Sequence, residues 1–272
     1  MNLRTIDITN INFTFNTKTT IINDISFSLK KGDVFAILGA SGSGKSTILR
    51  LLSDILGNKG GNTLDGAISI FGKTPKEYRL SGKLSFMFQS ANLMPNLTVR
   101  QNIEFPLKLR KEEIVKTEIE ELLETVGLKK YEHYYPKELS GGMKTRVALA
   151  RSFVTKPELL LLDEPFSALD VAWRFELYEY LEKVKEKYNT TVILVSHDIQ
   201  EAILLSNNIF VLSTKGAKIE DISINKGNQI KVFDYKNTNE FLEKNQNHFY
   251  NIQSTILRDG SRDRTEEKMD LI

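Results

Sequence analysis

The sequence contains no cysteine, which excludes disulfide bonds and thiolate metal sites. It also lacks any apolar stretch of the roughly 18 residues that a membrane-spanning helix needs, and its N-terminus lacks the apolar core of a signal peptide. The 37 basic and 35 acidic side chains nearly cancel, so the net charge of +2 gives no electrostatic reason to expect nucleic-acid binding. With 272 residues, the chain is long enough to bury one substantial two-part core.

A glycine-rich loop lies between an apolar run and an amphipathic segment. Residues 34–38 are apolar without interruption, which is typical of a strand buried on both faces. A helix is expected to begin near Lys45 and to end by Gly57, because apolar residues recur between them at helical spacing. The loop matches the G-x-x-x-x-G-K-[ST] pattern, whose backbone N–H groups bind phosphates. The predicted nucleotide-binding residues are Gly39, Ala40, Ser41, Gly42, Ser43, Gly44, Lys45, Ser46 and Thr47.

Two side chains of this loop have predicted roles at the phosphates. Lys45 is expected on the oxygens of the β- and γ-phosphates, and the Ser46 hydroxyl on Mg²⁺. The alternative is a glycine-rich turn with a chance lysine. The full pattern stands between a predicted strand and a predicted helix, which favours the nucleotide site.

A pair of carboxylates follows a second apolar run, residues 159–162. Asp163 is expected to reach Mg²⁺, and Glu164 is expected to polarise the attacking water. Adjacent residues of a strand point to opposite faces, which would allow the two carboxylates different roles. In the alternative, one of them is a solvated strand end. The pair predicts an ATPase rather than a passive nucleotide binder.

A histidine follows a third β-rich run, residues 191–195. His197 is therefore expected at the carboxyl end of a core strand, where ligands of open α/β sheets bind. A lone histidine is more often structural than catalytic, and its position alone does not decide between the two. His133 and His248 match no motif and are expected to be structural or exposed.

The segment Leu139-Ser140-Gly141-Gly142-Met143 stands between the phosphate loop and the carboxylate pair. With these motifs the chain resembles the ATP-binding-cassette (ABC) family from Ile6 to about Lys226. The resemblance implies an α/β fold: a P-loop NTPase core with an antiparallel β subdomain and an inserted helical subdomain. We expect the ABC domain at residues 3–226, with the helical insertion at about 91–156, and a short, partly mobile C-terminal extension at 227–272.

The resemblance also implies roles for further residues. His197 matches the switch histidine that contacts the γ-phosphate, and Gln89 matches the glutamine that senses Mg²⁺ and the attacking water. Phe15 occupies the place of the aromatic residue, usually tyrosine, that stacks on adenine. Phe13 is the rival, because alternation along a strand would place both rings on one face.

The Ser-Gly-Gly segment implies an assembly. In the family, Ser140, Gly141 and Gly142 would contact the ATP of a second subunit, so that two ATP molecules lie between two chains. The implied cofactors are ATP and Mg²⁺. The implied partners are a second copy or a homologous subunit, integral membrane permease subunits and, through them, an extracytoplasmic solute-binding protein. The implied location is the cytoplasmic face of the cell membrane, with no nucleic-acid partner.

The type of transport rests on less specific resemblance. Residues 86–103 look like the importer segment that docks on a permease, and Met143, in place of the commoner glutamine, is similar to the nitrate, sulfonate and taurine importer branch. The alternatives are an ABC ATPase that acts on DNA or ribosomes, the ATPase of an exporter or lipid system, and a nucleotide-binding regulator. A regulator would lack a catalytic carboxylate, so Glu164 argues against it.

Overall fold

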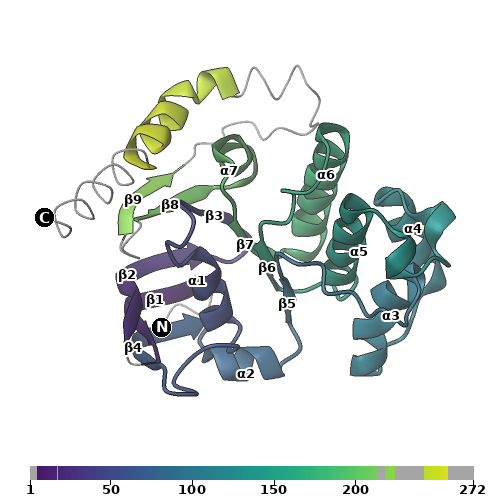
Figure 1. Ribbon diagram of the computed structural model, residues 1–272, viewed down its shortest axis with the longest axis horizontal. Helices are drawn as coiled ribbons and strands as arrows, with labels where there is room; N and C mark the ends of the chain where they lie inside the picture. Colours follow the sequence, from purple (N-terminus) through teal and green to yellow (C-terminus); the bar gives the residue numbers. More distant parts are fainter. Residues whose placement is uncertain (1–4, 17, 214–217, 224–241, 257–272) are drawn as a thin grey trace, which may run out of the picture.

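The computed structural model describes residues 5–16, 18–213, 218–223 and 242–256. Two β-sheets lie at one end of the molecule and a group of helices at the other (Figure 1). One sheet has three strands in the order β2-β1-β4, and the other has six in the order β5-β6-β7-β3-β8-β9. Within the described ranges, no helix combines the length and the apolarity that crossing a bilayer requires.

The three-stranded sheet is antiparallel. It consists of β1 (Thr5–Phe15), β2 (Thr19–Lys30) and β4 (Thr63–Ile70), with β1 in the middle. Buried apolar side chains such as Ile6, Ile8 and Phe13 line one side and pack in the same core as α1 (Lys45–Leu52). This arrangement confirms the expected antiparallel β subdomain.

The six-stranded sheet is parallel except for its last strand. It is formed by β3 (Val34–Gly39), β5 (Leu84–Met87), β6 (Leu159–Asp163), β7 (Thr191–Val195), β8 (Asn208–Leu212) and β9 (Lys218–Ser223). Every residue of β3, β6 and β7 is buried, because the central strands are covered on both faces. These three strands are neighbours, so their carboxyl ends bring three loops to one edge.

The helices between β5 and β6 form a lobe of their own (Figure 1). They are α3 (Val99–Arg110), α4 (Lys116–Thr125) and α5 (Gly141–Phe153), with short 3₁₀ turns at Lys129–Tyr131 and Pro136–Glu138. We call this part the helical lobe. It occupies the segment for which a helical insertion at about 91–156 was predicted, and those boundaries remain a prediction.

The remaining helices pack on the sheets. They are α1, α2 (Pro75–Leu80), α6 (Val171–Tyr188) and α7 (Ile199–Leu205). A further helical segment over residues 242–256 packs through the buried Ile252 on the core that contains α7, β3 and β8. The predicted domain limits at 3 and 226, and residues 227–241 and 257–272 of the predicted extension, lie outside the described residues.

One predicted helix end was wrong. The helix that starts at Lys45 ends at Leu52, before the expected Gly57. Asp54 adopts a left-handed backbone with φ 56°, and the N–H groups of Ile55 and Leu56 both donate to the Arg50 carbonyl. Such wrapping bonds close a helix at its C-terminus, so a residue other than glycine ends it.

Candidate functional site

The phosphate loop places a buried ammonium group at the start of α1. Lys45 is 7% exposed, and its Nζ donates to the carbonyl oxygens of Gly39 at 2.9 Å and Ala40 at 2.7 Å. Burial lowers the pKa of Lys45, whereas the negative charges of Glu164 and Asp163 raise it. A largely desolvated cation beside a helix N-terminus suits an anionic ligand.

The glycines of the loop allow the chain to turn tightly. Gly42 and Gly44 have φ of 82° and 91°, which side chains rarely permit. At Gly44, a Cβ would also lie 2.6 Å from the Cδ1 of Ile22. The loop therefore keeps its backbone bare, as close approach of backbone N–H groups to phosphate requires.

Asp163 and Ser46 meet below the loop. Asp163 ends β6 and is 1% exposed, and the Ser46 hydroxyl donates to its Oδ1 at 2.7 Å. Burial raises the pKa of Asp163, and the hydrogen bond from Ser46 lowers it. A carboxylate beside a hydroxyl supplies the hard oxygen ligands that Mg²⁺ prefers.

Glu164 lies outside the strand, which changes the reason for its separate role. Its backbone is left-handed with φ 49°, and its N–H donates to the Val195 carbonyl at 2.9 Å. The expectation that strand alternation separates the two carboxylates was therefore wrong. The turn of the backbone after Asp163 separates them instead.

Three predicted catalytic side chains meet at the Glu164 carboxylate. Gln89 Nε2 donates to Glu164 Oε2 at 2.9 Å, and His197 Nδ1 lies 3.6 Å from the same oxygen. These residues follow β5, β6 and β7, respectively. The Glu164 side chain is 21% exposed and that of His197 is 62% exposed, so the cluster faces solvent and is open to a ligand. Their individual roles remain predictions.

The Ser-Gly-Gly segment begins helix α5, in the helical lobe. Ser140 caps the helix, and its Oγ accepts from the Met143 N–H at 3.2 Å. A Cβ on Gly141 would meet open space, whereas one on Gly142 would lie 3.3 Å from the Ala168 carbonyl oxygen. The segment thus offers an exposed helix N-terminus on a different lobe from Lys45 (Figure 1).

The two candidate aromatic residues of β1 differ in exposure. Phe13 is fully buried in the core, whereas Phe15 ends the strand and is 44% exposed. Only Phe15 presents a ring that a ligand can reach. Thus Phe15 remains the candidate for stacking on adenine, and Phe13 is a core residue.

A family of known proteins matches much of this chain. A family model described as ABC transporter matches residues 22–167, more than half of the chain. The chain belongs to the ABC transporter family. A second model, described as an AAA domain, putative AbiEii toxin, Type IV TA system, matches residues 134–202.

Individual ABC proteins show how far the similarity extends. The aliphatic sulfonates import ATP-binding protein SsuB of a Bacillus cereus strain is 44% identical over 206 residues, which cover 76% of this chain and 79% of that protein. The nitrate import ATP-binding protein NrtD of a Synechocystis strain is 36% identical over 231 residues, covering 81% and 82%. The dimeric post-hydrolysis structure of the ATP-binding cassette MJ0796 bound to ADP and Pi has a TM-score of 0.72 and 27% identity, covering 81% of this chain and 99% of that one.

A buried amide holds the loop ahead of α3 in this ABC chain. Asn102 is fully buried; its Oδ1 accepts from the Met94 N–H at 2.8 Å, and its Nδ2 donates to the carbonyls of Met94, Leu97 and Thr98. Leu93 packs partly buried on the core, whereas Met94 is 38% exposed. Asn102 does not stand out in the sequence, because its partners are backbone groups that no residue pattern reveals.

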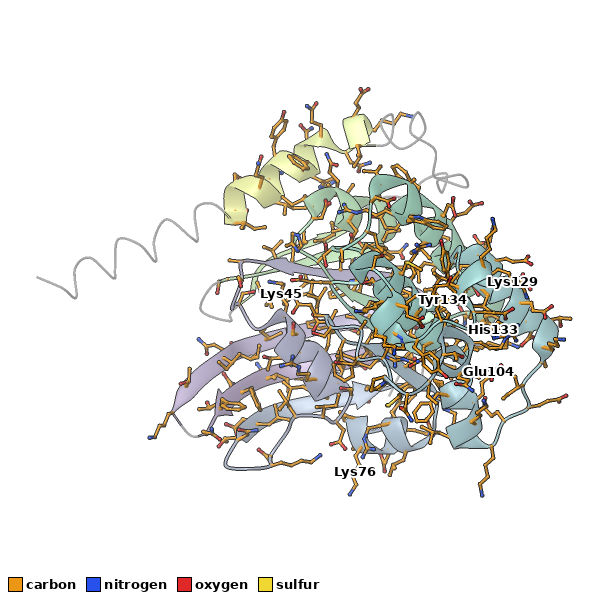
Figure 2. The ribbon with its side chains drawn as sticks, turned by 45° about the vertical axis from the view of Figure 1, so that its right-hand side comes forward. Lys45, Lys76, Glu104, Lys129, His133 and Tyr134 are labelled. Carbon is orange, nitrogen blue, oxygen red and sulfur yellow. The ribbon has the colours of Figure 1, made fainter. Side chains whose placement is uncertain are left out.

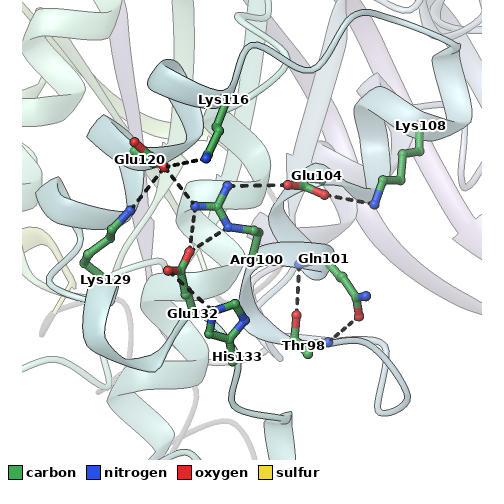
Figure 3. A network of polar contacts seen from close by, with 10 residues as sticks. All are labelled: Thr98, Arg100, Gln101, Glu104, Lys108, Lys116, Glu120, Lys129, Glu132 and His133. Atoms are coloured by element: carbon green, nitrogen blue, oxygen red, sulfur yellow. Dashed lines mark hydrogen bonds and ion pairs between the residues drawn. The ribbon is translucent and has the colours of Figure 1, made fainter.

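An ion-pair network joins the start of α3 to the segment that leads to Ser140. The Arg100 guanidinium lies 2.6 Å from Glu132, 3.6 Å from Glu120 and 3.7 Å from Glu104 (Figure 3). The Arg100 N–H also donates to the Glu132 carbonyl at 2.9 Å. Figure 2 shows Glu104 and other labelled side chains of the helical lobe well apart from Lys45. The network holds α3, α4 and the loop after α4 together.

A buried carboxyl group beside the ABC site was missed by sequence reasoning. Glu201 is 4% exposed, and the Tyr178 hydroxyl donates to its Oε2 at 3.4 Å. It lines a small cavity together with Glu164 and His197. Burial, reinforced by nearby Asp198, raises the pKa of Glu201 to about 8. A glutamate in the first turn of a helix is usually exposed, so the sequence carried no signal for it.

Glu201→Gln will increase thermal stability at alkaline pH. The folded-state pKa of Glu201, about 8, lies above its ordinary value of 4.5, so the wild type loses stability as pH rises between these values. Gln does not titrate. The melting temperature of Glu201→Gln, relative to wild type, will therefore rise by roughly 10 °C between pH 5 and pH 9 in thermal scans. The exposed Glu186→Gln is the control, and a pH-independent difference for Glu201→Gln would contradict the assignment.

Proposed function

We propose that the chain is the ATP-hydrolysing subunit of an ABC importer for a small oxyanion. The observation that carries the proposal is the meeting of Gln89, Glu164 and His197 beside the phosphate loop. The similarity to import ATP-binding proteins over three quarters of the chain supports the direction of transport. A non-transport ATPase and an exporter ATPase, the alternatives left open by the sequence, lack this support.

Nucleotide binding uses the phosphate loop, including Lys45, and the Phe15 ring. Lys45 and the loop N–H groups bind the β- and γ-phosphates, and Phe15 stacks on adenine. The side chains that would hold Mg²⁺ are Ser46, Asp163 and Gln89, and the contact between the first two fits a hard cation. When bound, Mg²⁺ neutralises phosphate charge and acts as a Lewis acid.

Hydrolysis is assigned to the cluster around Glu164. Gln89 donates to the Glu164 carboxylate, and the Glu164 backbone N–H donates to the Val195 carbonyl, so both the side chain and the backbone of Glu164 are held in place. Glu164 orients and polarises the attacking water, and His197 contacts the γ-phosphate. The three residues come from three different loops. Loss of the γ-phosphate would therefore change the contacts of three loops at once.

The assembly follows from the position of Ser140. The exposed N-terminus of α5, which Ser140 caps, lies on another lobe from Lys45. It is suited to the γ-phosphate of an ATP bound by a second subunit. Two such subunits, identical or homologous, would bind at the cytoplasmic face of the membrane to integral permease subunits. An extracytoplasmic solute-binding protein would deliver the cargo, and no nucleic acid takes part.

An alkanesulfonate such as taurine is the cargo that the comparisons favour. Relatives named for aliphatic sulfonate import reach 44% identity, and the relative named for nitrate import reaches 36%. Nitrate is a further candidate. The ATPase subunit does not touch the cargo, so the proposal is tested by transport rather than by the ATP site.

Met94→Asp will abolish import without weakening ATP binding. The Met94 side chain is exposed on a loop that Asn102 holds in place, and it lies outside the phosphate site. An exposed apolar side chain on a fixed loop is a suitable contact for a short permease helix. A strain that lacks the chain is complemented with wild type or the variant, and uptake of labelled taurine is measured. We expect uptake to fall more than tenfold while ATP affinity of the purified variant stays within twofold.

The control is Ile55→Asp, which places the same charge on an exposed apolar side chain after α1. Leu93 is unsuitable as a second test position, because its side chain packs against the core and a charge there would disturb the fold. Normal taurine uptake by Met94→Asp would refute the docking role of the loop. Failure of wild type to restore uptake of taurine and other alkanesulfonates, with nitrate uptake restored, would replace sulfonate by nitrate as the cargo.

A further inference from the structure

Two adjacent side chains in the first turn of α6 reach toward different parts of the site. Asp170 caps this helix, and its Oδ1 accepts from the Trp173 N–H at 3.1 Å. Trp173 contacts the helical lobe, and Arg174 contacts the loop after β7. The start of α6 therefore lies where the loop before it, the helical lobe and the loop after β7 come together.

The Trp173 ring stacks on a side chain of α5, the helix that Ser140 caps. The Arg146 guanidinium carbon lies 3.9 Å from the centroid of the Trp173 ring, and Arg146 is only 8% exposed. Its Nη1 donates to the Val126 carbonyl at 2.7 Å. The backbone of Gly127 also packs against the ring, since a Cβ there would lie 1.8 Å from Trp173 Cη2. A desolvated guanidinium stacked on an indole is a strong, geometrically specific contact.

Arg174 connects the same turn to the loop that carries His197. Its Nε donates to the Leu169 carbonyl at 3.1 Å, and its Nη1 lies 3.4 Å from Asp198 Oδ2. Asp198 follows His197 directly and caps α7. Both partners of this ion pair are about one third exposed, so the pair is weaker than the Trp173 stack and easier to break.

The loop between β6 and α6 completes the connection. Ala168 lies against Gly142 closely enough that a Cβ on the glycine would be 3.3 Å from the Ala168 carbonyl oxygen. Segments 140–142, 167–170 and 197–198 are thus joined through one helical turn. The joint has a stiff contact on the Ser140 side and a breakable one on the His197 side.

We propose that Trp173 and Arg174 are positioning residues that relay the state of the His197 loop to the Ser140–Gly142 segment of the same chain. The proposal rests on the proposed function, in which His197 contacts one ATP and Ser140 faces the other. Movement of the His197 loop would pull on Arg174 through Asp198, turn the start of α6, and shift α5 through the stack on Arg146. The relay would make each ATP site sensitive to the other.

Trp173 is the single tryptophan of the sequence, so its fluorescence reports on the relay directly. Purified wild-type chain is titrated with ATP and Mg²⁺ at concentrations that keep it monomeric, and binding is measured separately by calorimetry. We expect a saturable change in Trp173 emission that follows binding. Arg174→Met will lose at least four fifths of the change, Arg174→Lys will retain most of it, and the exposed control Lys183→Met will behave as wild type.

A second measurement asks whether the signal reaches Ser140. Hydrogen exchange is followed for the peptide over residues 139–147 with and without ATP and Mg²⁺. We expect the nucleotide-dependent change in exchange to persist in Trp173→Phe, which keeps an aromatic face for Arg146, and to vanish in Trp173→Leu. If Trp173→Leu does not fold, Arg146→Lys replaces it, because it keeps the charge and loses the planar stack.

The outcomes separate the relay from the ATPase assignment. Nucleotide binding without a change in Trp173 emission, or an equal change in Arg174→Met, would overturn the relay and leave the proposed function standing. An equal response of residues 139–147 in the Phe and Leu variants would also overturn it. Absence of nucleotide binding by the wild type would refute the proposed function and the relay together.

Discussion

Lys45→Ala will remove measurable ATP binding, whereas Glu164→Gln will bind ATP normally and hydrolyse it roughly 10²- to 10⁴-fold more slowly. The difference follows from where the two charges lie. The Lys45 ammonium is buried at the loop and is the one cation that the loop itself offers to the phosphates. The Glu164 carboxylate lies beside Gln89 and His197, where its proposed task is to orient water.

The two variants are compared by titration with a fluorescent ATP analogue and by a phosphate-release assay. Glu164→Gln keeps the shape of the side chain, and the amide oxygen of the new Gln can still accept from Gln89. The fold is therefore not at risk. Melting curves serve as the control for Lys45→Ala, since the substitution removes two hydrogen bonds to the Gly39 and Ala40 carbonyls. Equal loss of ATP binding in both variants would show that the division of roles is wrong.

The second large effect concerns assembly. Glu164→Gln with ATP and Mg²⁺ will shift from monomer to dimer in analytical ultracentrifugation, because slow hydrolysis traps the nucleotide that joins the two chains. Adding Ser140→Arg will abolish the shift. The new side chain places bulk and charge at the helix N-terminus where the partner's γ-phosphate would lie, beside the open space at Gly141.

Ser140→Arg also removes a helix cap, which costs about 1 kcal/mol. A melting curve without nucleotide measures this loss separately from dimerisation. Thr117→Arg, at an exposed position of α4 in the same lobe, is the matched control and should dimerise as the single variant does. If Glu164→Gln/Ser140→Arg dimerises as well as Glu164→Gln, the sandwich of two ATP molecules between two chains does not describe this protein.

The parts of the site that the sequence predicted are those fixed by local pattern. The loop before Lys45 and the strand ending at Asp163 were recognisable because a buried strand reads as an unbroken apolar run. The carboxyl ends of parallel neighbours share one edge, so the approach of Gln89 and His197 to Glu164 followed once the strands were placed.

The parts that escaped prediction depend on contacts between distant segments. The end of α1 is set by Asp54 in a left-handed conformation, although an aspartate carries no clear stop signal. Asn102, Glu201 and Trp173 take their roles from partners brought close by folding alone. Trp173 stacks on a charged partner, Arg146, that spacing along the helix does not reveal.

The backbone at Glu164 sets folding against chemistry at one position. With φ of 49°, the residue occupies a conformation that costs a side-chain-bearing residue roughly 1 kcal/mol and costs glycine much less. A designer who optimises this chain for heat resistance by matching residues to backbone angles would therefore be led to replace the acid to which the proposed function assigns hydrolysis. Under the proposed function, stability and activity favour different residues at position 164.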